Sequence, residues 1–339
     1  MKKVVILLLT ALLFLGCSNK RYFEPQEVAG YVDFDGTLPA KIVDVLRDGA
    51  TLDNGQFISR DGLEDYKFPQ NFIFLHKSGG YYIATSKCGE LQVVDTKSKK
   101  LVFDKKFDMK TPVAASIKGN YLALVMSDNT LMLYDLSSQK VVYSSKQKPA
   151  IAVDTKVANP FFLDSLVIFP TLDGKLVVVD PRSAKEVRNI VVGSAEHFNN
   201  IIFLNVIDEK LIAATPNRIV SINPSFMNSL DVDLSDVLYV KERVYLLTKD
   251  GRIILTDPEL NPLKQRKFPF AHFTGAIYGE YIYVIEKGGY LLALDKDLRA
   301  SNIFSFASTF GIGQEIDEYI FTSKDKVFYA DKFFKLNKL

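Results

Sequence analysis

The sequence predicts an all-β fold: a β-propeller of four-stranded antiparallel blades, eight in number, with seven blades as the alternative. Three observations lead to this prediction. One turn pattern recurs eight times along the chain. Valine, isoleucine, tyrosine and phenylalanine dominate between the turns, as strands prefer. No stretch after Cys17 shows the apolar period of 3.6 residues that a helix would need.

The N-terminal segment is typical of an exported lipoprotein. Met1-Lys2-Lys3 is followed by an apolar run from Val4 to Leu15, which matches a secretory signal and is shorter than the roughly 20 residues of a membrane-spanning helix. Phe14-Leu15-Gly16-Cys17 resembles the bacterial lipobox, although Phe14 replaces the usual Leu and Leu15 a smaller residue. We therefore predict a signal peptide over residues 1–16, lipidation of Cys17 and a lipidated tether over residues 17–27.

The residue after the cysteine indicates which of the two membranes holds the protein. Ser18 follows Cys17, whereas Asp in that place often retains lipoproteins of this kind at the inner membrane. We therefore expect an outer-membrane lipoprotein that faces the periplasm, held to the membrane by its acyl chains.

Charge and cysteine content exclude several classes of protein. Lys and Arg number 42 and Asp and Glu 40, so removal of Lys2 and Lys3 leaves 40 of each. This balance gives no general attraction for nucleic acid, and we expect no nucleic-acid partner. Once Cys17 is acylated, Cys88 is the one remaining thiol, so a disulfide scaffold is impossible. We expect Cys88 to be a partly buried thiol rather than a nucleophile.

The recurring pattern is a turn residue (Gly, Asn or Asp), an apolar residue at +2, and Asp or Asn at +6. Successive copies are 34, 40, 45, 43, 34, 38 and 36 residues apart. The pairs are Gly55/Asp61, Gly89/Asp95, Asn129/Asp135, Gly174/Asp180, Asn217/Asn223, Gly251/Asp257, Gly289/Asp295 and Asp325/Asp331. Gly, Asn and Asp tolerate the positive φ of tight hairpins, so each pair marks two turns around a short strand.

Each unit is therefore four short strands in about 40 residues. In one unit we expect strands over 120–125, 130–134 and 141–144. A four-stranded sheet cannot bury both faces alone, and stacking such sheets around an axis solves this problem. We assign residues 28–339 to the propeller and expect residues 28–34 to supply a strand that closes the ring. The alternative is a β-sandwich.

Two units carry a family likeness best. Leu172-Asp173-Gly174-Lys175-Leu176-Val177-Val178-Val179-Asp180 and Lys249-Asp250-Gly251-Arg252-Ile253-Ile254-Leu255-Thr256-Asp257 resemble the quinoprotein-type (PQQ-like) propeller repeat. A lipoprotein with eight such repeats is similar to the BamB family of outer-membrane assembly lipoproteins. The resemblance implies a scaffold that is not an enzyme, binds an outer-membrane barrel-assembly protein and acts as a monomer within a hetero-complex. Family repeats often place a Trp between blades; this chain has none, and Phe103 and Tyr143 stand there in two units.

We considered three kinds of chemistry. Asp33-Phe34-Asp35-Gly36-Thr37 matches the signature of haloacid-dehalogenase-type phosphatases, but that chemistry needs a parallel α/β domain. Quinoprotein dehydrogenases stack their cofactor on Trp under a vicinal disulfide. This chain has no Trp and, once Cys17 is acylated, one thiol, so we expect no cofactor. His76, His197 and His272 lie in different units without a ligand spacing, so we expect them to be hydrogen-bonded or exposed, and we predict no metal site and no catalytic residue.

One turn is unusually apolar. Phe226 and Met227 stand where other units place Ser, Lys or Gln, and aromatic residues and Met are enriched at interfaces. We predict that these two residues contact a partner, the alternative being that they pack between blades. The leading hypothesis is thus a lipid-anchored scaffold in outer-membrane barrel assembly. The alternative is a periplasmic ligand-binding or enzymatic propeller.

Overall fold

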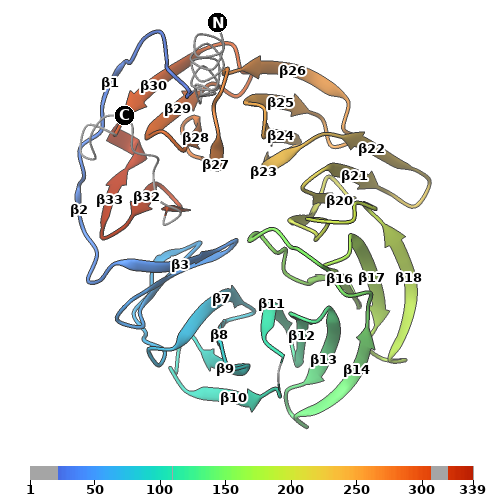
Figure 1. Cartoon of the computed structure of the whole chain (residues 1–339). Helices are drawn as coiled ribbons and strands as arrows, with labels where there is room; N and C mark the ends of the chain where they lie inside the picture. Colours follow the sequence, from blue (N-terminus) through green and yellow to red (C-terminus); the bar gives the residue numbers. More distant parts are fainter. Residues whose placement is uncertain (1–21, 109, 307–319, 339) are drawn as a thin grey trace, which may run out of the picture.

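The computed structural model describes residues 22–108, 110–306 and 320–338, which form a ring of eight β-sheets around a central axis (Figure 1). The prediction of an eight-bladed propeller is confirmed, and the seven-bladed alternative is wrong. The predicted signal peptide and the lipidation site Cys17 lie outside the described residues. No helix in the described ranges is long and apolar enough to cross a membrane.

The first seven sheets each contain four consecutive strands. Their bounds are as follows: β3 (Ile42–Leu46), β4 (Gly49–Leu52), β5 (Phe57–Ser59) and β6 (Gly62–Leu63); β7 (Phe72–Ser78), β8 (Tyr81–Ser86), β9 (Glu90–Asp95) and β10 (Leu101–Lys106); β11 (Pro112–Lys118), β12 (Tyr121–Met126), β13 (Thr130–Asp135) and β14 (Lys140–Lys146); β15 (Phe161–Leu163), β16 (Leu166–Pro170), β17 (Lys175–Asp180) and β18 (Lys185–Val191); β19 (Phe203–Ile207), β20 (Lys210–Thr215), β21 (Arg218–Ile222) and β22 (Met227–Asp231); β23 (Leu234–Val240), β24 (Arg243–Thr248), β25 (Arg252–Thr256) and β26 (Pro262–Lys267); β27 (Phe273–Tyr278), β28 (Ile282–Glu286), β29 (Tyr290–Leu294) and β30 (Ser301–Ser305).

Residues from both ends of the described chain share the eighth sheet. It runs in the order β31 (Ile320–Ser323), β32 (Lys326–Tyr329), β33 (Lys332–Lys335) and β2 (Gly36–Thr37), and a 3-10 turn, η3 (Leu336–Lys338), follows. β2 pairs antiparallel with β33 and thereby closes the ring. The predicted closing segment, residues 28–34, is wrong by a few residues, since its strand β1 (Gly30–Tyr31) instead adds a fifth, parallel strand outside β30.

The two faces of the ring differ in the connections they carry. Because neighbouring strands within the seven consecutive sheets are antiparallel, the loops between sheets share a face with the turns between second and third strands. We call this the linker face. The opposite face carries the turns between first and second and between third and fourth strands. The first strand of each sheet lies nearest the axis (Figure 1).

The predicted unit matches the structure closely. The expected strands over 120–125, 130–134 and 141–144 correspond to β12, β13 and β14. The positive φ that the turns require is present at Asn129 (61°) and at Gly174 (86°). In the first seven sheets each anchor pair flanks the third strand, whereas Asp325 and Asp331 flank β32, the second strand of the eighth sheet. The last match is therefore one strand out of step with the other seven.

The core consists of apolar clusters between adjacent sheets. The described residues contain one such cluster for each neighbouring pair, including the pair formed by the first and last sheets. Phe57 and Phe74 stack at 4.1 Å between the first two sheets. Phe103 packs edge-on against Tyr134 of the next sheet at 5.5 Å between ring centroids. Aromatic rings thus fill the space that Trp fills in family repeats, and burial of both faces of each sheet stabilises the ring.

Candidate functional site

A channel of 1160 Å³ lies at the centre of the ring. First strands from sheets all around the ring line it, and they contribute both apolar and charged side chains. β-bulges interrupt several of these strands, with register shifts between Ile42 and Asp44, between Phe74 and His76, and between Leu234 and Asp236. A bulge re-aims the side chains that follow it, and Asp44, His76 and Asp236 all line the channel.

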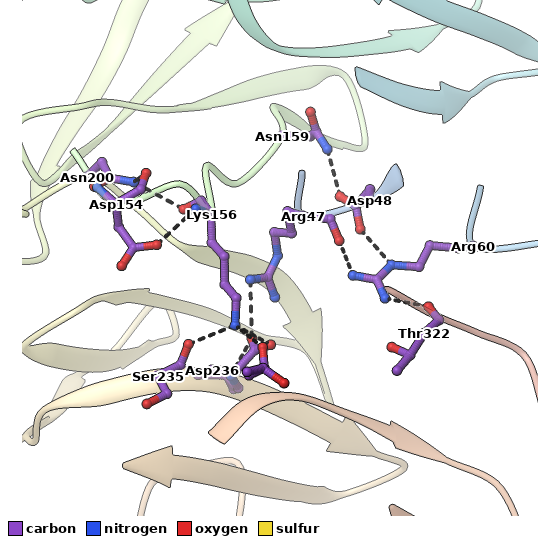
Figure 2. Close-up of polar contacts among 12 residues, drawn as sticks. Arg47, Asp48, Arg60, Asp154, Lys156, Asn159, Asn200, Ser235, Asp236 and Thr322 are labelled. Carbon is purple, nitrogen blue, oxygen red and sulfur yellow. Dashed lines mark hydrogen bonds and ion pairs between the residues drawn. The ribbon is translucent and has the colours of Figure 1, made fainter. Parts of the chain in front are cut away.

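The connection between β14 and β15 enters this channel. We call residues 147–160 the channel loop. The Lys156 ammonium donates three hydrogen bonds, each 2.9 Å long, to the Asp236 carboxylate and to the backbone carbonyls of Ser235 and Thr274 (Figure 2). These are all the donors that an ammonium has. One side chain of the loop therefore binds to the two sheets that contain β23 and β27.

Asp236 also receives a contact from the far side of the ring. Arg47, in the turn after β3, lies 3.4 Å from the second Asp236 oxygen, and its guanidinium covers the ring of Phe203 at 5.2 Å. Burial raises the pKa of Asp236, but the charges of Lys156 and Arg47 outweigh burial and hold the pKa below its usual value. Asp236 is thus an anion shared by two cations from distant sheets.

A second carboxylate, Asp48, anchors the other end of the loop. Asn159 donates a hydrogen bond to Asp48 at 2.7 Å and accepts one from the backbone N–H of Ala115 at 3.0 Å. Arg60 donates to Asp48 at 3.1 Å and to the Thr322 carbonyl at 3.1 Å (Figure 2). Burial raises the pKa of Asp48, but the nearby charges, Arg60 first, lower it to about 2. The loop is therefore tied to sheets on three sides of the channel.

The outer part of the loop is also fixed. The Asn200 carboxamide accepts a hydrogen bond from the Asp154 N–H at 2.7 Å and donates to the carbonyls of Asp154 and Lys156. Phe198 donates its N–H to the Ala152 carbonyl at 3.0 Å. The channel loop and the connection between β18 and β19 thus form one joined surface on the linker face.

That joined surface presents apolar side chains to solvent. Ile151 is 73% exposed, Phe198 51% and Val153 41%. Phe198 has a φ of 49°, which is unusual for a bulky residue and marks a conformation held by its surroundings. We call these three residues the loop patch. Exposed apolar groups on a rigid loop are typical of protein contact sites.

The Phe203 ring in the channel is not available to stack a planar quinone. Arg47 covers this ring, and the bonds of Lys156 and Asn159 cross the channel. Within the described ranges no group of three or more His, Cys, Asp or Glu side chains is placed to hold a metal ion. Three channel atoms, Asp44 Oδ1, His76 Nδ1 and Ser323 Oγ, have no hydrogen-bond partner in the structure.

The two partner-contact residues predicted from the sequence, and Cys88, lie outside the channel. Phe226 and Met227 sit at the turn between β21 and β22, on the opposite face, and are 44% and 51% exposed, so the alternative that both are buried between blades does not hold. Cys88 is exposed, and the expectation that it is partly buried is wrong, because the turn before Gly89 points its side chain to solvent.

The histidines and the phosphatase-like motif also have defined places. His197 and His272 are exposed as expected, but His76 lies in the channel with its Nδ1 3.9 Å from Asp48 and no hydrogen bond, so the expectation fails for it. Burial, the largest cause, lowers the pKa of His76. Gly36-Thr37 of the motif form the closing strand β2. His76 was considered in the sequence analysis but not predicted to be functional, and the other channel residues described above were not named there. The two longest repeat spacings, 45 and 43, contain the two connections that carry the loop patch.

Comparison with known proteins agrees with the fold. Residues 51–297 match the family model described as outer membrane protein assembly factor BamB. The chain belongs to this family. It is 32% identical over 380 residues to the plasminogen-binding protein PgbB of Helicobacter pylori strain J99, and 31% identical over 379 residues to that of strain 26695. Each match covers 97% of this chain and 70% of the relative.

A solved structure shows the same architecture. The crystal structure of BamB from Moraxella catarrhalis matches 88% of this chain and 99% of that one, with a TM-score of 0.65 at 15% identity. That identity supports the fold alone. Taken with the family match, it makes this chain a BamB-like propeller with PQQ-type repeats, a protein-interaction scaffold.

Proposed function

We propose that this chain is a non-enzymatic, lipid-anchored scaffold that binds a component of outer-membrane β-barrel assembly through the loop patch. The observation that carries the proposal is that the channel loop is held by hydrogen bonds and yet exposes apolar side chains. Lys156, Asn159 and Asn200 fix the channel loop, and Ile151, 73% exposed, stands next to Ala152, whose carbonyl accepts the Phe198 N–H. A preorganised apolar anchor loses little conformational entropy on binding.

The N-terminal sequence and the family support the proposed location. Acylation of Cys17 would fix the propeller to the membrane, and the BamB family is described as an outer-membrane assembly factor. The scaffold would therefore face the periplasm as a monomer within a hetero-complex.

The test is affinity capture of the mature lipoprotein from crosslinked, detergent-extracted envelopes. We expect an outer-membrane barrel-assembly protein to be captured by the wild-type chain and lost with the pair Ile151→Ser and Phe198→Ser. The comparison pair is Phe226→Ser with Met227→Ser, which removes two other exposed apolar residues, 44% and 51% exposed, from the opposite face. If only the second pair abolishes capture, the partner binds at the turn predicted from the sequence; if neither does, both sites fail.

A second candidate function comes from the relatives. Two proteins more than 30% identical to this chain are described as plasminogen-binding, which supports plasminogen as a ligand of a propeller exposed at the cell surface. Surface plasmon resonance with purified plasminogen tests this. Saturable binding by the folded chain would support it, and absence of binding would leave the assembly role as the single proposal.

A further inference from the structure

The segment before β1 is docked on the propeller rather than loose. Phe23 is 7% exposed and packs edge-on against Phe268 at 6.1 Å and Tyr290 at 5.5 Å. Ala29 then donates its N–H to the Ile303 carbonyl at 2.8 Å, just before β1 pairs with β30. The chain therefore reaches the ring at the boundary between the sheets of β23–β26 and β27–β30.

This docking limits how far the ring can stand from a membrane. The inference rests on the proposed lipidation of Cys17, five residues before Tyr22. Five residues span about 17 Å when fully extended, and the headgroup layer of one leaflet is about 5–8 Å thick. A rigid closed ring attached by so short a link has one edge close to the bilayer surface, the edge around Tyr22.

That edge carries two exposed aromatic side chains. Tyr22 is 48% exposed and Phe270 46%, and both line a groove of 830 Å³ between the docked segment and the end of β26. Tyrosine is enriched where lipid headgroups meet hydrocarbon, because its ring is apolar and its hydroxyl polar.

The backbone at Phe270 supports a function for its side chain. The Ala271 N–H donates to the Phe268 carbonyl at 3.1 Å, which closes a turn with Pro269 and Phe270 at its centre. Phe270 has a φ of 64°, at the position of a type II turn where Gly is preferred. An exposed phenylalanine kept in a conformation that glycine adopts more easily is the kind of strain found at contact sites.

Charge does not dominate this edge. Arg266 and Lys267 line the same groove as Glu24 and Glu27, and Lys267 is paired with Asp250 at 3.0 Å. The contact would therefore depend on the aromatic side chains more than on attraction to anionic lipid.

We propose that Tyr22 and Phe270 form a membrane-contact edge that inserts into the lipid headgroup layer and holds the ring with the sheets of β23–β26 and β27–β30 toward the bilayer. The sheets of β7–β10 and β11–β14, on the other side of the ring (Figure 1), then point away from the membrane.

The experiment uses the full lipidated chain in vesicles of phosphatidylethanolamine and phosphatidylglycerol. The background is Cys88→Ser, so that an environment-sensitive fluorophore attaches at a single introduced thiol. One probe is placed at Glu24→Cys beside the edge and the other at Val141→Cys, which is 45% exposed on β14. Quenching by spin-labelled lipids reports proximity to the bilayer, and vesicle flotation reports anchoring.

We expect the probe at position 24 to be quenched and the probe at position 141 not. Tyr22→Ser with Phe270→Ser should reduce quenching at position 24 severalfold without changing flotation, while Phe226→Ser should change neither. Equal quenching at both positions with intact flotation would overturn the proposal, and so would quenching that the aromatic pair does not alter.

The remaining outcomes separate the alternatives. Failure to float would remove the lipid anchor of the proposed function, and the contact edge with it. Crosslinking of the position 24 thiol to a second protein chain, in place of quenching by spin-labelled lipid, would show that protein covers the edge and would likewise overturn membrane contact.

Discussion

The Lys156 ammonium lies 2.9 Å from the Asp236 carboxylate, although Lys156 precedes the fourth sheet of the ring and Asp236 lies in the sixth. Both side chains are largely buried, with 24% and 18% of their surfaces exposed. Because a buried ion is costly without its partner, this contact couples the placement of the channel loop to the integrity of the ring.

Replacement of Lys156 should therefore be costly. Lys156→Met keeps the volume but leaves two carbonyls without the Lys156 donor and removes one of the two cations beside the Asp236 carboxylate, so we expect the free energy of unfolding to fall by about 3 kcal/mol. Urea denaturation measures the loss. The control is Lys118→Met, because Lys118 is exposed and its ammonium reaches only the Asp164 carbonyl; its effect should stay within about 0.5 kcal/mol. Equal effects would contradict the role of the ion pair.

Asp48 should make stability depend on pH in the acid range. Its pKa is about 2 in the folded chain and about 3.9 when unfolded, so its contribution is complete above the unfolded value and is lost as pH falls toward 2. The difference of about 1.9 pKa units corresponds to about 2.6 kcal/mol. We expect Asp48→Asn to be destabilised by this amount at pH 7 and to approach the wild type near pH 2. Urea unfolding of both chains across this range measures it; a gap independent of pH would refute the assignment.

The stacked pair Phe57 and Phe74 should be a main source of stability at the first sheet boundary. Phe57 is fully buried, so Phe57→Ala leaves a cavity and should cost about 4 kcal/mol. Phe226→Ala removes the same side chain from an exposed turn and should cost less than about 0.5 kcal/mol. Thermal unfolding followed by circular dichroism compares the two. A small effect at Phe57 would mean that the neighbouring sheets repack around the loss.

Two turn glycines should differ in their tolerance of alanine. Gly251 has a φ of +81°, and a Cβ there would lie 2.3 Å from the Phe268 carbonyl oxygen, whereas Gly119 has a φ of +58° and nothing within 4 Å of that position. Gly119→Ala should cost about 1 kcal/mol from backbone strain alone. Gly251→Ala should cost more than twice as much, because the backbone must also move. Denaturant midpoints decide between them.

Local chemistry explains why the propeller was predictable from sequence. The turns at Asn129 and Gly174 require a positive φ, which Gly, Asn and Asp adopt more readily than other residues. The residue types therefore reveal the turns. Alternating apolar residues between those turns determine the strands. The sequence also predicted that Phe103 takes the place of a Trp, and Phe103 does pack between two sheets.

The channel was not predictable in the same way. Arg47, Asp48 and Asp236 look like ordinary surface charges in the sequence, and only the closure of the ring brings Arg47 next to a residue 189 positions away. The bulge before Asp236 has no residue signature, since any residue can occupy it. The long connection that holds Lys156 was visible as a longer repeat spacing, but its direction, into the axis, depends on partners from other sheets.

Completion of the last sheet by β2 has a consequence for biogenesis. Lys335 donates its N–H to Asp35 at 2.7 Å, across 300 positions of the chain, and contacts of such long range form slowly. A polypeptide is made N-terminus first, so β2 must wait unpaired until β33 has been made. Until then Phe321 and Phe328, which the finished ring buries between its first and last sheets, are open to wrong partners. The unfinished propeller therefore depends on protection against aggregation until β33 is in place.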